Sequence, residues 1–499
     1  MVQHYMIDWK EFICCNRGLL IAPAGHGKTT AIADCLLQCP ESSCQLVLTH
    51  THAGIASLRN KFRKKNVPSS CYQLDTITGF AQRYVLNYLG KSALPEETDR
   101  DYFTVAIEKC CKLLQTKVVQ AVIKLSYDGI FVDEYQDCTI KQHCMIMELA
   151  YDLPLHLLGD PLQGIFSFER TALVDFDKDL GIFSRFDLLK HPWRWQKCNP
   201  FLGDYIYGLR NALEKHQTVR LKSYPQNEVC VIHCSSEDDK LKSLRSAIKQ
   251  YDCNSLLIIC PSYKVTDKYG QIRPKGDVRD RIKIKQRVDF GNQFSIIDAI
   301  DSQEYYKCAK EIDIFIEKCR KGRGIRKIAR FYDIIESLHF NISEVSKWIK
   351  RKDNRIVERE KDNKLQSIQL KDLFSVFESE TTYSSLKNVI KFIAELPKVK
   401  YYHRNLYYTI LRCIDMAQTN NTSMFEAMKM LKNRVRHQGR RIDGKCFGTT
   451  LLTKGLEFDT VVVYDANKFE DAKNFYVAIS RACKKLIIIT ESLSLNFNR

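Results

Sequence analysis

The sequence lacks the long apolar runs that would cross a membrane. None of its hydrophobic stretches approaches the roughly 20 residues that a bilayer-spanning helix needs, and the first residues, MVQHYMIDWK, do not follow the charged, apolar and small-residue order of a signal peptide. Internal repeats and low-complexity tracts are missing as well, which argues against a repeat architecture. We therefore expect a cytoplasmic protein with no membrane partner.

Cysteine pairs at the spacing of a metal site are also missing. The 20 cysteines occur as singletons and as adjacent pairs such as Cys14-Cys15, with no CxxC pair among them. We interpret them as reduced, mostly buried thiols. A metal ion or iron–sulfur cluster on Cys35, Cys39 and Cys44 is the alternative, and it is disfavoured because two of these residues fall on the helix expected after a glycine-rich loop.

Length and charge indicate several domains and a polyanionic partner. A chain of 499 residues, 44% of them hydrophobic, can bury more than one core, and we expect two to four domains. The net charge of +18 is unevenly distributed, because residues 1–180 carry a net −3 and residues 181–499 a net +21. A basic surface of that size is typical of nucleic-acid binding, and a solvated basic face is the alternative.

Short apolar runs predict two parallel β-sheets with crossover helices. The first series lies at 18–21, 45–49, 129–132 and 155–158, and the second lies at 255–260, 460–464 and 486–490. The runs end in small or polar residues, and the carboxyl ends of parallel strands are where such sheets bind ligands. Residues 271–444, which interrupt the second series, indicate a helical, charge-rich insertion.

A phosphate-binding loop follows the first predicted strand. In APAGHGKTT, from Ala22 to Thr30, small residues allow backbone N–H groups to point inward at a polyphosphate, and the next helix adds its positive N-terminal end. Lys28 would reach the β- and γ-phosphates of ATP, and the Thr29 hydroxyl would be a ligand of Mg²⁺. The residues expected to hold the nucleotide here are Ala24, Gly25, His26, Gly27, Lys28, Thr29 and Thr30. A glycine-rich turn without a ligand is the alternative.

An acidic pair completes the predicted hydrolytic site. After the third predicted strand comes FVDEYQD, in which Asp133 can hold Mg²⁺ through water and Glu134 can orient and deprotonate the attacking water. An acidic surface turn is the alternative, and the phosphate-binding loop about 100 residues earlier weighs against it. The pair therefore predicts ATP hydrolysis together with Lys28 and Thr29.

These motifs resemble those of superfamily 1 helicases of the UvrD/Rep/PcrA type. Seven segments are similar to the family's motifs in order and spacing: LTHTHAG (48–54), DTITGFAQR (75–83), VDEYQD (132–137), LGDPLQGIFSF (158–168), HPWRW (191–195), TTLLTKGLEF (449–458) and YVAISRA (476–482). The resemblance implies an α/β fold with two RecA-like parallel-sheet domains of the P-loop NTPase class and helical insertions.

The resemblance also implies a domain layout. The first RecA-like domain is expected at 1–85 and 120–178, with a small helical insertion at 86–119. The second RecA-like domain is expected at 179–270 and 445–499, with a helical, basic insertion at 271–444.

Further residues are carried over from the family to the nucleotide site. Gln163 resembles the glutamine that senses the γ-phosphate, and Arg194 and Arg481 resemble the two arginines that reach this phosphate from the second domain. An aromatic ring that stacks on adenine and a carboxylate that meets the ribose are also implied. The residues assigned to nucleotide binding in these segments are Trp193 for adenine, Glu457 for the ribose, and Gly455. The nucleotide is expected between the two sheets, where closing and opening would be the mechanical step.

Single-stranded DNA is the partner that the resemblance implies. His50, Phe166 and Phe168 are the candidates for stacking on bases, which grips a strand without reading its sequence. The candidates for contacts with the backbone of the strand are Thr51, Thr76, Thr78 and Thr449. Packing in a core is the alternative for each of these residues.

Two basic stretches extend the expected DNA surface to a tailed duplex. They are KCRKGRGIRKIAR at 318–330 and KNRVRHQGRR at 432–441. The first stretch predicts a helix whose basic side contacts phosphates, because the insertion occupies the position of the family's duplex-facing domain. The residues on that side would be Arg320, Arg323, Lys327 and Arg330. A solvated face is the alternative.

At several positions the sequence departs from the family's motifs, which limits how many of the family's residue roles can be assigned to it. MIDWKEF (6–12) has no glutamine where the family reads adenine, which leaves selectivity for ATP open. Leu451 stands where a histidine is common and Glu169 replaces a common arginine, so weaker single-strand contacts are expected. The first insertion has room for only a few short helices, so little duplex-facing surface is expected.

The expected function is an ATP- and Mg²⁺-dependent helicase or translocase on single-stranded DNA, and the resemblance implies 3′→5′ polarity. The alternative is a DNA-sensing ATPase that regulates a partner nuclease and unwinds little. The compact size and small first insertion are similar to the helicase subunit of the Gabija anti-phage system, whose partner is an ATP-responsive endonuclease. Only 18 residues follow Arg481, too few for a fused nuclease, so any cleavage is expected from another polypeptide.

Overall fold

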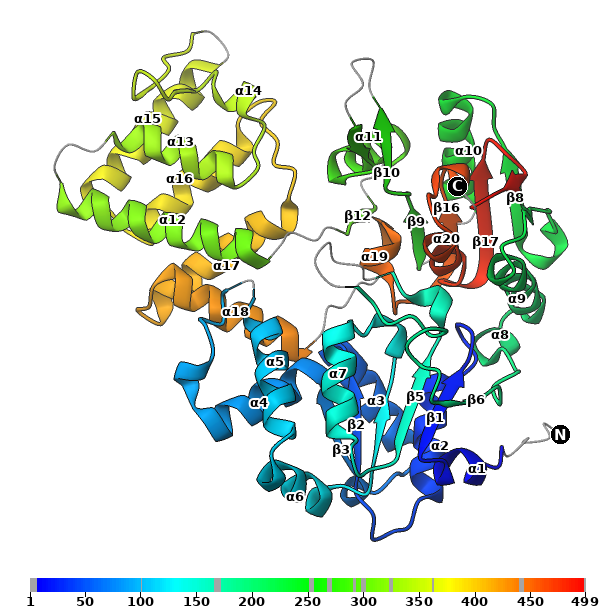
Figure 1. Cartoon of the computed structure of the whole chain (residues 1–499). Coiled ribbons are helices and arrows are strands. Elements are labelled where there is room, and N and C mark those ends of the chain that lie inside the picture. Colours follow the sequence, from blue (N-terminus) through cyan, green and yellow to red (C-terminus); the bar gives the residue numbers. More distant parts are fainter. Residues whose placement is uncertain are drawn as a thin grey trace. The chain divides into compact units, whose positions relative to one another are not determined.

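The structure, a computed structural model, divides the chain into two compact units. One consists of Met1–Ile297 and Arg436–Arg499, and the other of Asp298–Val435 (Figure 1). The residues that it describes are 7–99, 101–165, 172–250, 255–266, 272–289, 293–297, 302–322, 326–360, 363–438 and 444–497. Within these ranges, no helix combines the length and the apolar character that crossing a membrane requires.

The first unit contains a six-stranded sheet built from the N-terminal apolar runs. In spatial order its strands are β3 (Tyr72–Thr76), β2 (Gln45–Thr49), β4 (Gly129–Val132), β5 (Leu155–Gly159), β1 (Arg17–Ile21) and β6 (Ser184–Phe186). All neighbours pair in parallel. β2, β4 and β5 are buried along their whole length, because apolar clusters cover both faces of the sheet.

The helices of this first sheet connect its strands, apart from α1, which precedes β1. They are α1 (Lys10–Cys14), α2 (Lys28–Gln38), α3 (His52–Lys64), α4 (Ile77–Leu89), α5 (Tyr102–Leu114), α6 (Lys117–Ser126) and α7 (Ile140–Leu149). α5 packs on α4 and α7. α4 and α6 run across the insertion boundaries predicted after residues 85 and 119, so this insertion is continuous with the helices of the first sheet.

A second six-stranded sheet lies in the same unit. In spatial order its strands are β12 (Ser295–Ile296), β15 (Lys445–Gly448), β9 (Leu256–Ile259), β16 (Phe458–Val463), β17 (Ala482–Thr490) and β8 (Val229–His233). All neighbours are again parallel. Figure 1 shows the two sheets in different colours, blue to cyan for most of the first and green to red for the second. Two parallel sheets of this kind confirm the predicted α/β fold and agree with two RecA-like domains.

Helices and two antiparallel strand pairs accompany the second sheet. The helices are α8 (Trp193–Gln196), α9 (Pro200–Glu214), α10 (Glu237–Gln250), α11 (Val278–Val288), α19 (Thr450–Thr453) and α20 (Ala472–Ile479). The antiparallel pairs are β7 (Val219–Arg220) with β18 (Ser494–Leu495) and β10 (Tyr263–Thr266) with β11 (Ile272–Lys275). Because β12 pairs with β15, this sheet includes residues as far as Ile296 before the helical unit. The second compact unit, Asp298–Val435, lies within the range 271–444 that the sequence predicts for the helical insertion.

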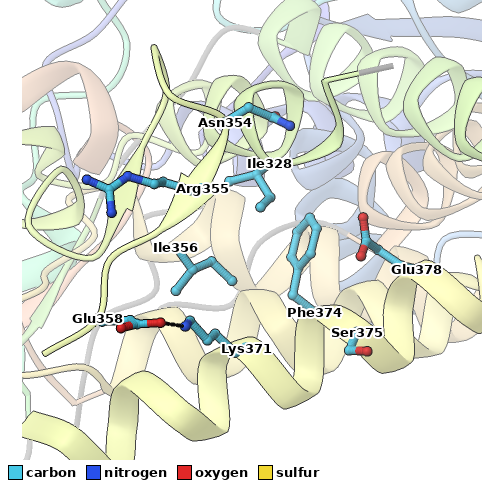
Figure 2. A pocket seen from close by; sticks show the side chains of 9 residues that line it. All are labelled: Ile328, Asn354, Arg355, Ile356, Glu358, Lys371, Phe374, Ser375 and Glu378. Carbon is cyan, nitrogen blue, oxygen red and sulfur yellow. Dashed lines mark hydrogen bonds and ion pairs between the residues drawn. The ribbon is translucent and has the colours of Figure 1, made fainter. Parts of the chain in front are cut away.

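The second unit is helical and has its own core. Its elements are α12 (Ser302–Lys321), α13 (Lys327–Ser337), α14 (Ile342–Val345), β13 (Ile349–Lys350), β14 (Arg355–Ile356), α15 (Lys364–Glu380), α16 (Tyr383–Glu395), α17 (Arg404–Thr419) and α18 (Met424–Gln438). The buried residues of its core all fall between Tyr305 and Leu431. A groove of about 350 Å³ is lined by Ile356, by Phe374 and by the Glu358–Lys371 ion pair (Figure 2).

The expected basic helix at 318–330 is interrupted. α12 ends at Lys321, the next residue, Gly322, has a left-handed φ of 74°, and α13 begins at Lys327. Arg320 donates to the Thr381 carbonyl at 3.3 Å. Arg323 lies outside the described residues. The prediction of one continuous basic side is therefore wrong, because a glycine ends the first helix inside the charge run.

Asp313 should contribute to the stability of the helical unit. Its carboxylate accepts the backbone N–H groups of Met424 and Phe425 at 2.9 and 3.0 Å and the Tyr383 hydroxyl at 2.5 Å. Asp313→Ala leaves two N-terminal donors of α18 without partners, so the free energy of unfolding should fall by about 1–3 kcal/mol. Urea unfolding measures the loss. Asp333→Ala, which removes an exposed pair with Arg351, is the matched control, and equal effects of the two substitutions would contradict the assignment.

Candidate nucleotide site

The phosphate-binding loop connects β1 to α2 and depends on two glycines. Gly25 and Gly27 have left-handed φ angles of 73° and 94°, which other residues adopt only with strain. A Cβ on Gly25 would lie 2.7 Å from the Trp195 ring. The glycines therefore allow both the turn of the loop and the close approach of the HPWRW segment.

Lys28 lies inside this loop. Only 7% of the residue is exposed, and its ammonium group donates to the carbonyls of Ala22 and Pro23 at 2.7 and 3.2 Å. His26 is buried beside it, and burial lowers the pKa of its imidazole to about 4, so this ring is neutral at pH 7. The charge of the loop therefore comes from Lys28.

The acidic pair follows β4, as the sequence predicts. Asp133 is 3% exposed, and its carboxylate interacts with the Thr29 hydroxyl. Burial and the neighbouring Glu134 raise the pKa of Asp133 to about 7, against the opposing effect of Lys28. Thr29 and Asp133, which come from two different strand ends, thus lie together as oxygen donors next to the loop.

Glu134 is held in the ionised form that a base requires. Its φ of 58° is left-handed, which turns the residue away from the extended path of β4. Burial alone would raise the pKa of its carboxyl, but the positive charges of Lys28 and Lys454 outweigh burial and lower it. The amide of Gln136 donates to this carboxylate as well.

Gln163 belongs to a buried hydrogen-bond network that reaches the acidic pair. Its amide donates to Asp160 at 2.9 Å, and the backbone N–H of Asp160 donates to the Gln136 side chain at 3.0 Å. Because Gln136 also contacts Glu134, a continuous set of hydrogen bonds connects Gln163 with the predicted base. The structure therefore brings the two sequence motifs into one network.

Residues of the second sheet approach the same loop. Arg194 donates from its backbone N–H to the Gly25 carbonyl at 3.0 Å, while its guanidinium pairs with Glu457 at 2.7 Å and donates to the Ser480 carbonyl at 2.6 Å. Trp193 is 42% exposed and its ring lies against Gly27. Arg194, Glu457 and Trp193 thus lie close together next to the loop.

Arg481 lies near Arg194 and Glu457 and is almost fully buried. It donates to the carbonyls of Val477 and Leu456 at 2.9 and 3.3 Å. Burial, together with the charge of Arg194, lowers the pKa of its guanidinium to about 10, and Glu457 and Glu134 oppose this effect. Gly455, in the segment before it, has a left-handed φ of 80°. Arg481 thus remains charged at pH 7 within the electrostatic reach of the predicted base.

Three side chains that the sequence analysis missed join the two sheets. The Tyr476 hydroxyl accepts the Ala24 backbone N–H at 2.9 Å. Arg210 pairs with Asp160 at 3.2 Å. Lys454 donates to both carboxylate oxygens of Asp137 and to the Gln163 carbonyl. Tyr476 and Lys454 lie within recognised motifs and could have been found there. Arg210 lies in α9 outside every motif, so no sequence signal marked it.

Lys61 is a further missed residue near the nucleotide loop. Its ammonium group donates to the Thr30 hydroxyl at 3.0 Å. Burial lowers the pKa of this amine, and the charges of Glu457 and Asp133 act against burial. Lys61 therefore adds a cation to the loop from α3.

The residues predicted to contact DNA follow strand ends, but several are enclosed. Thr76 and Thr449 are buried, and the Thr76 hydroxyl accepts the Gly79 N–H as the N-cap of α4. Thr51 caps α3 in the same way, and His50 contacts the buried Cys138 thiol at 3.3 Å. Thr78 is half-buried. Phe166, Phe168 and Glu169 lie outside the described residues.

Comparisons with known proteins agree with the motif assignment in part of the chain. Residues 91–179 match the model of the UvrD/REP helicase N-terminal domain, and this segment contains the acidic pair and Gln163. This segment, less than a fifth of the chain, is therefore similar to the UvrD/REP helicase N-terminal domain. No curated protein matches the chain.

Two solved structures of an arterivirus helicase are also similar to the chain. One is the complex of arterivirus nonstructural protein 10 with DNA, 14% identical over 48% of this chain and 47% of that chain, with a TM-score of 0.27. The other is a crystal structure of the same viral protein, 15% identical over 49% and 46%, with a TM-score of 0.26. The alignment thus covers about half of the length of the viral helicase.

Lys454→Met should weaken the junction of the two sheets. It leaves the Asp137 carboxylate buried without its cation, and breaking a buried pair in this way costs about 3–5 kcal/mol of stability. Burial already raises the pKa of Asp137 to about 7 and Lys454 opposes this rise, so the substitution raises the pKa further. A protonated carboxyl needs no cation, and the loss of stability should therefore be smaller at pH 6 than at pH 8.

Urea unfolding of Lys454→Met at the two pH values measures this effect. The double variant Asp137→Asn, Lys454→Met removes both charges and should recover part of the missing stability. A single variant as stable as the unsubstituted protein at pH 8 would contradict the role of the ion pair.

Proposed function

We propose that the protein is an ATP- and Mg²⁺-dependent DNA helicase or translocase of the UvrD type, which moves 3′→5′ on single-stranded DNA. One observation carries the proposal: the loop and acidic pair of the first sheet meet Arg194, Tyr476 and Arg481 of the second sheet at one site. A hydrolytic site shared between two RecA-like sheets is sensitive to their relative movement. Hydrolysis there can therefore drive translocation along a strand.

The residues present fit ATP and Mg²⁺. Gly25 and Gly27 leave the loop backbone open to a polyphosphate, and α2 begins at Lys28 with its N–H groups directed toward the loop. Thr29 and Asp133 offer the hard oxygen donors that Mg²⁺ prefers. When bound, the metal ion neutralises charge on the phosphates.

The side chains of the protein have separate tasks in this proposal. Glu134, kept ionised by nearby cations, accepts a proton from the attacking water. Lys28, Arg194 and Arg481 stabilise negative charge on the phosphates. Gln163 connects this chemistry to the Asp160 network, and Trp193 offers an aromatic surface for the base.

The DNA surface is proposed at the carboxyl ends of the strands. His50, Thr51 and Thr78 lie near those ends in the first sheet and Thr449 lies at the end of β15 in the second. The net charge of +21 over residues 181–499 favours a polyanionic partner. The partners proposed are single-stranded DNA and a tailed duplex.

A second candidate function is a DNA-sensing ATPase that regulates a nuclease partner, with an anti-phage role of the Gabija type. It is favoured by the region between α4 and β4, where α5 packs on α4 and α7 as part of the core of the first sheet. Such an insertion adds little surface that could split a duplex. Weak unwinding with strong DNA-stimulated hydrolysis would fit this candidate.

Glu134→Gln should separate nucleotide binding from hydrolysis. The amide keeps the shape of the side chain but cannot take the proton, so turnover should fall by at least about 10²-fold, while affinity for ATP persists. Lys28→Ala should instead weaken ATP binding itself. Steady-state phosphate release and equilibrium binding of a labelled nucleotide distinguish the two. Normal turnover in Glu134→Gln, or normal affinity in Lys28→Ala, would contradict the assigned roles.

Strand displacement on 3′-tailed, 5′-tailed and blunt duplexes with ATP and Mg²⁺ tests the helicase proposal. Displacement that needs a 3′ tail supports a 3′→5′ helicase. Hydrolysis stimulated by DNA without displacement of any strand supports the sensing ATPase. Hydrolysis that does not respond to DNA would overturn both candidates.

A further inference from the structure

We propose that the helical unit carries a separate stacking site for single-stranded DNA, formed by Lys398, Lys400, Tyr401, Arg404, Tyr407 and Tyr408. We call this set the tyrosine surface. It lies at the start of α17 and in the turn before it, in KVKYYHRNLYY. None of the residues expected to contact DNA from the helicase motifs belongs to it. The inference rests on the proposed function only in taking DNA as the partner.

The aromatic rings of the tyrosine surface are held in place by one another. Tyr401 and Tyr407 are stacked, with ring centroids 4.2 Å apart and planes at 22°. Tyr408 meets Tyr407 edge-on at 5.2 Å, and its hydroxyl is 3.3 Å from that of Tyr401. Tyr407 is 5% exposed and packs on Phe340 in the core of the unit. A base that stacks here would meet a rigid surface, so binding restricts little side-chain freedom.

One ring of the set remains accessible to a ligand. Tyr408 is 48% exposed. Large aromatic side chains are usually more deeply buried than this. A base has two π-faces and can stack on any exposed aromatic ring, whatever its sequence. The exposed Tyr408 ring, next to the buried Tyr407 and the half-buried Tyr401, is therefore suited to an unpaired base.

One cation contacts these rings, and two more lie in the preceding turn of the chain. The Arg404 guanidinium lies 5.8 Å from the centre of the Tyr408 ring and interacts with the hydroxyls of Tyr401 and Tyr408. Lys398 and Lys400 are exposed in the preceding turn. Between residues 387 and 412 the chain contains six lysines and arginines, Arg412 included, and a single acidic residue, Glu395. Base stacking together with phosphate contacts is the combination that grips a single strand.

The groove of Figure 2 is another candidate DNA site in the described part of the helical unit, and its charges suit DNA less well. Glu358 and Glu378 line it together with Lys371 and Arg355. Carboxylates at that position repel phosphates. The tyrosine surface combines rings with an excess of positive charge, so single-stranded DNA fits it better than it fits the groove.

Two substitutions at one position test stacking. Tyr408→Leu keeps an apolar side chain but removes the ring, and affinity for a labelled oligothymidine should fall about fivefold or more. Tyr408→Phe keeps the ring and should bind like the unsubstituted protein. Tyr151→Leu, which changes an exposed tyrosine of the other unit (67% exposed), is the matched control and should have no effect. Fluorescence anisotropy measures the affinities, and thermal unfolding confirms that each variant is folded.

The charges of the surface are tested by salt dependence. In the double variant Lys398→Ala, Lys400→Ala, the slope of log affinity against log salt should become shallower by about 0.7 for each phosphate that no longer meets a cation. An unchanged slope would show that Lys398 and Lys400 do not contact the phosphates of the strand.

The outcomes separate this inference from the proposed function. If the unsubstituted protein binds no oligonucleotide, DNA binding itself is wrong and both proposals fail. If it binds and Tyr408→Leu binds equally well, only the stacking site is overturned. A loss of the same size in Tyr408→Phe would assign the effect to the hydroxyl and also overturn stacking. A loss confined to oligouridine would assign the surface to RNA instead of DNA.

Discussion

The buried contact of Lys454 with Asp137 and the Gln163 carbonyl holds the two sheets together next to the predicted base. Both charged side chains are about 6% exposed, and a buried ion without its partner costs several kcal/mol. The contact connects the segment after β4, the segment after β5 and the KGLEF segment of the second sheet. Because Asp137 lies three residues after Glu134, the predicted base is positioned by a residue of the other sheet. The arrangement of the proposed hydrolytic site therefore depends on this junction.

The other contacts between the sheets follow the same pattern. Tyr476 accepts the Ala24 N–H, and Arg210 pairs with the fully buried Asp160. Each contact joins a group of the second sheet to a residue next to the phosphate-binding loop or the Gln163 network. A change at the phosphates would alter these contacts, and movement of the second sheet would alter the site. This reciprocity is what the conversion of ATP hydrolysis into translocation requires.

The features that could be predicted from the sequence are those with local causes. Buried parallel strands such as β4 are continuous apolar runs, and the phosphate-binding loop needs glycines at positions with left-handed φ. Edge strands such as β3 were missed because their residues are half-buried and show no apolar run. A threonine at a strand end looks the same whether it contacts DNA or caps a helix, as Thr76 does. Arg210 could not be found because its partner, Asp160, is distant in sequence and only the fold brings the two together.

Hydrogen exchange with and without ATP tests the central claim, that both sheets hold the nucleotide. The Glu134→Gln variant with Mg²⁺ is suited to it, because slow turnover keeps ATP bound. ATP should slow exchange in two peptides, one containing residues 22–30 and the other containing residues 476–482. The Lys28→Ala variant is the control and should show neither effect. Protection of residues 22–30 alone, with unchanged exchange at residues 476–482, would contradict a site shared between the sheets.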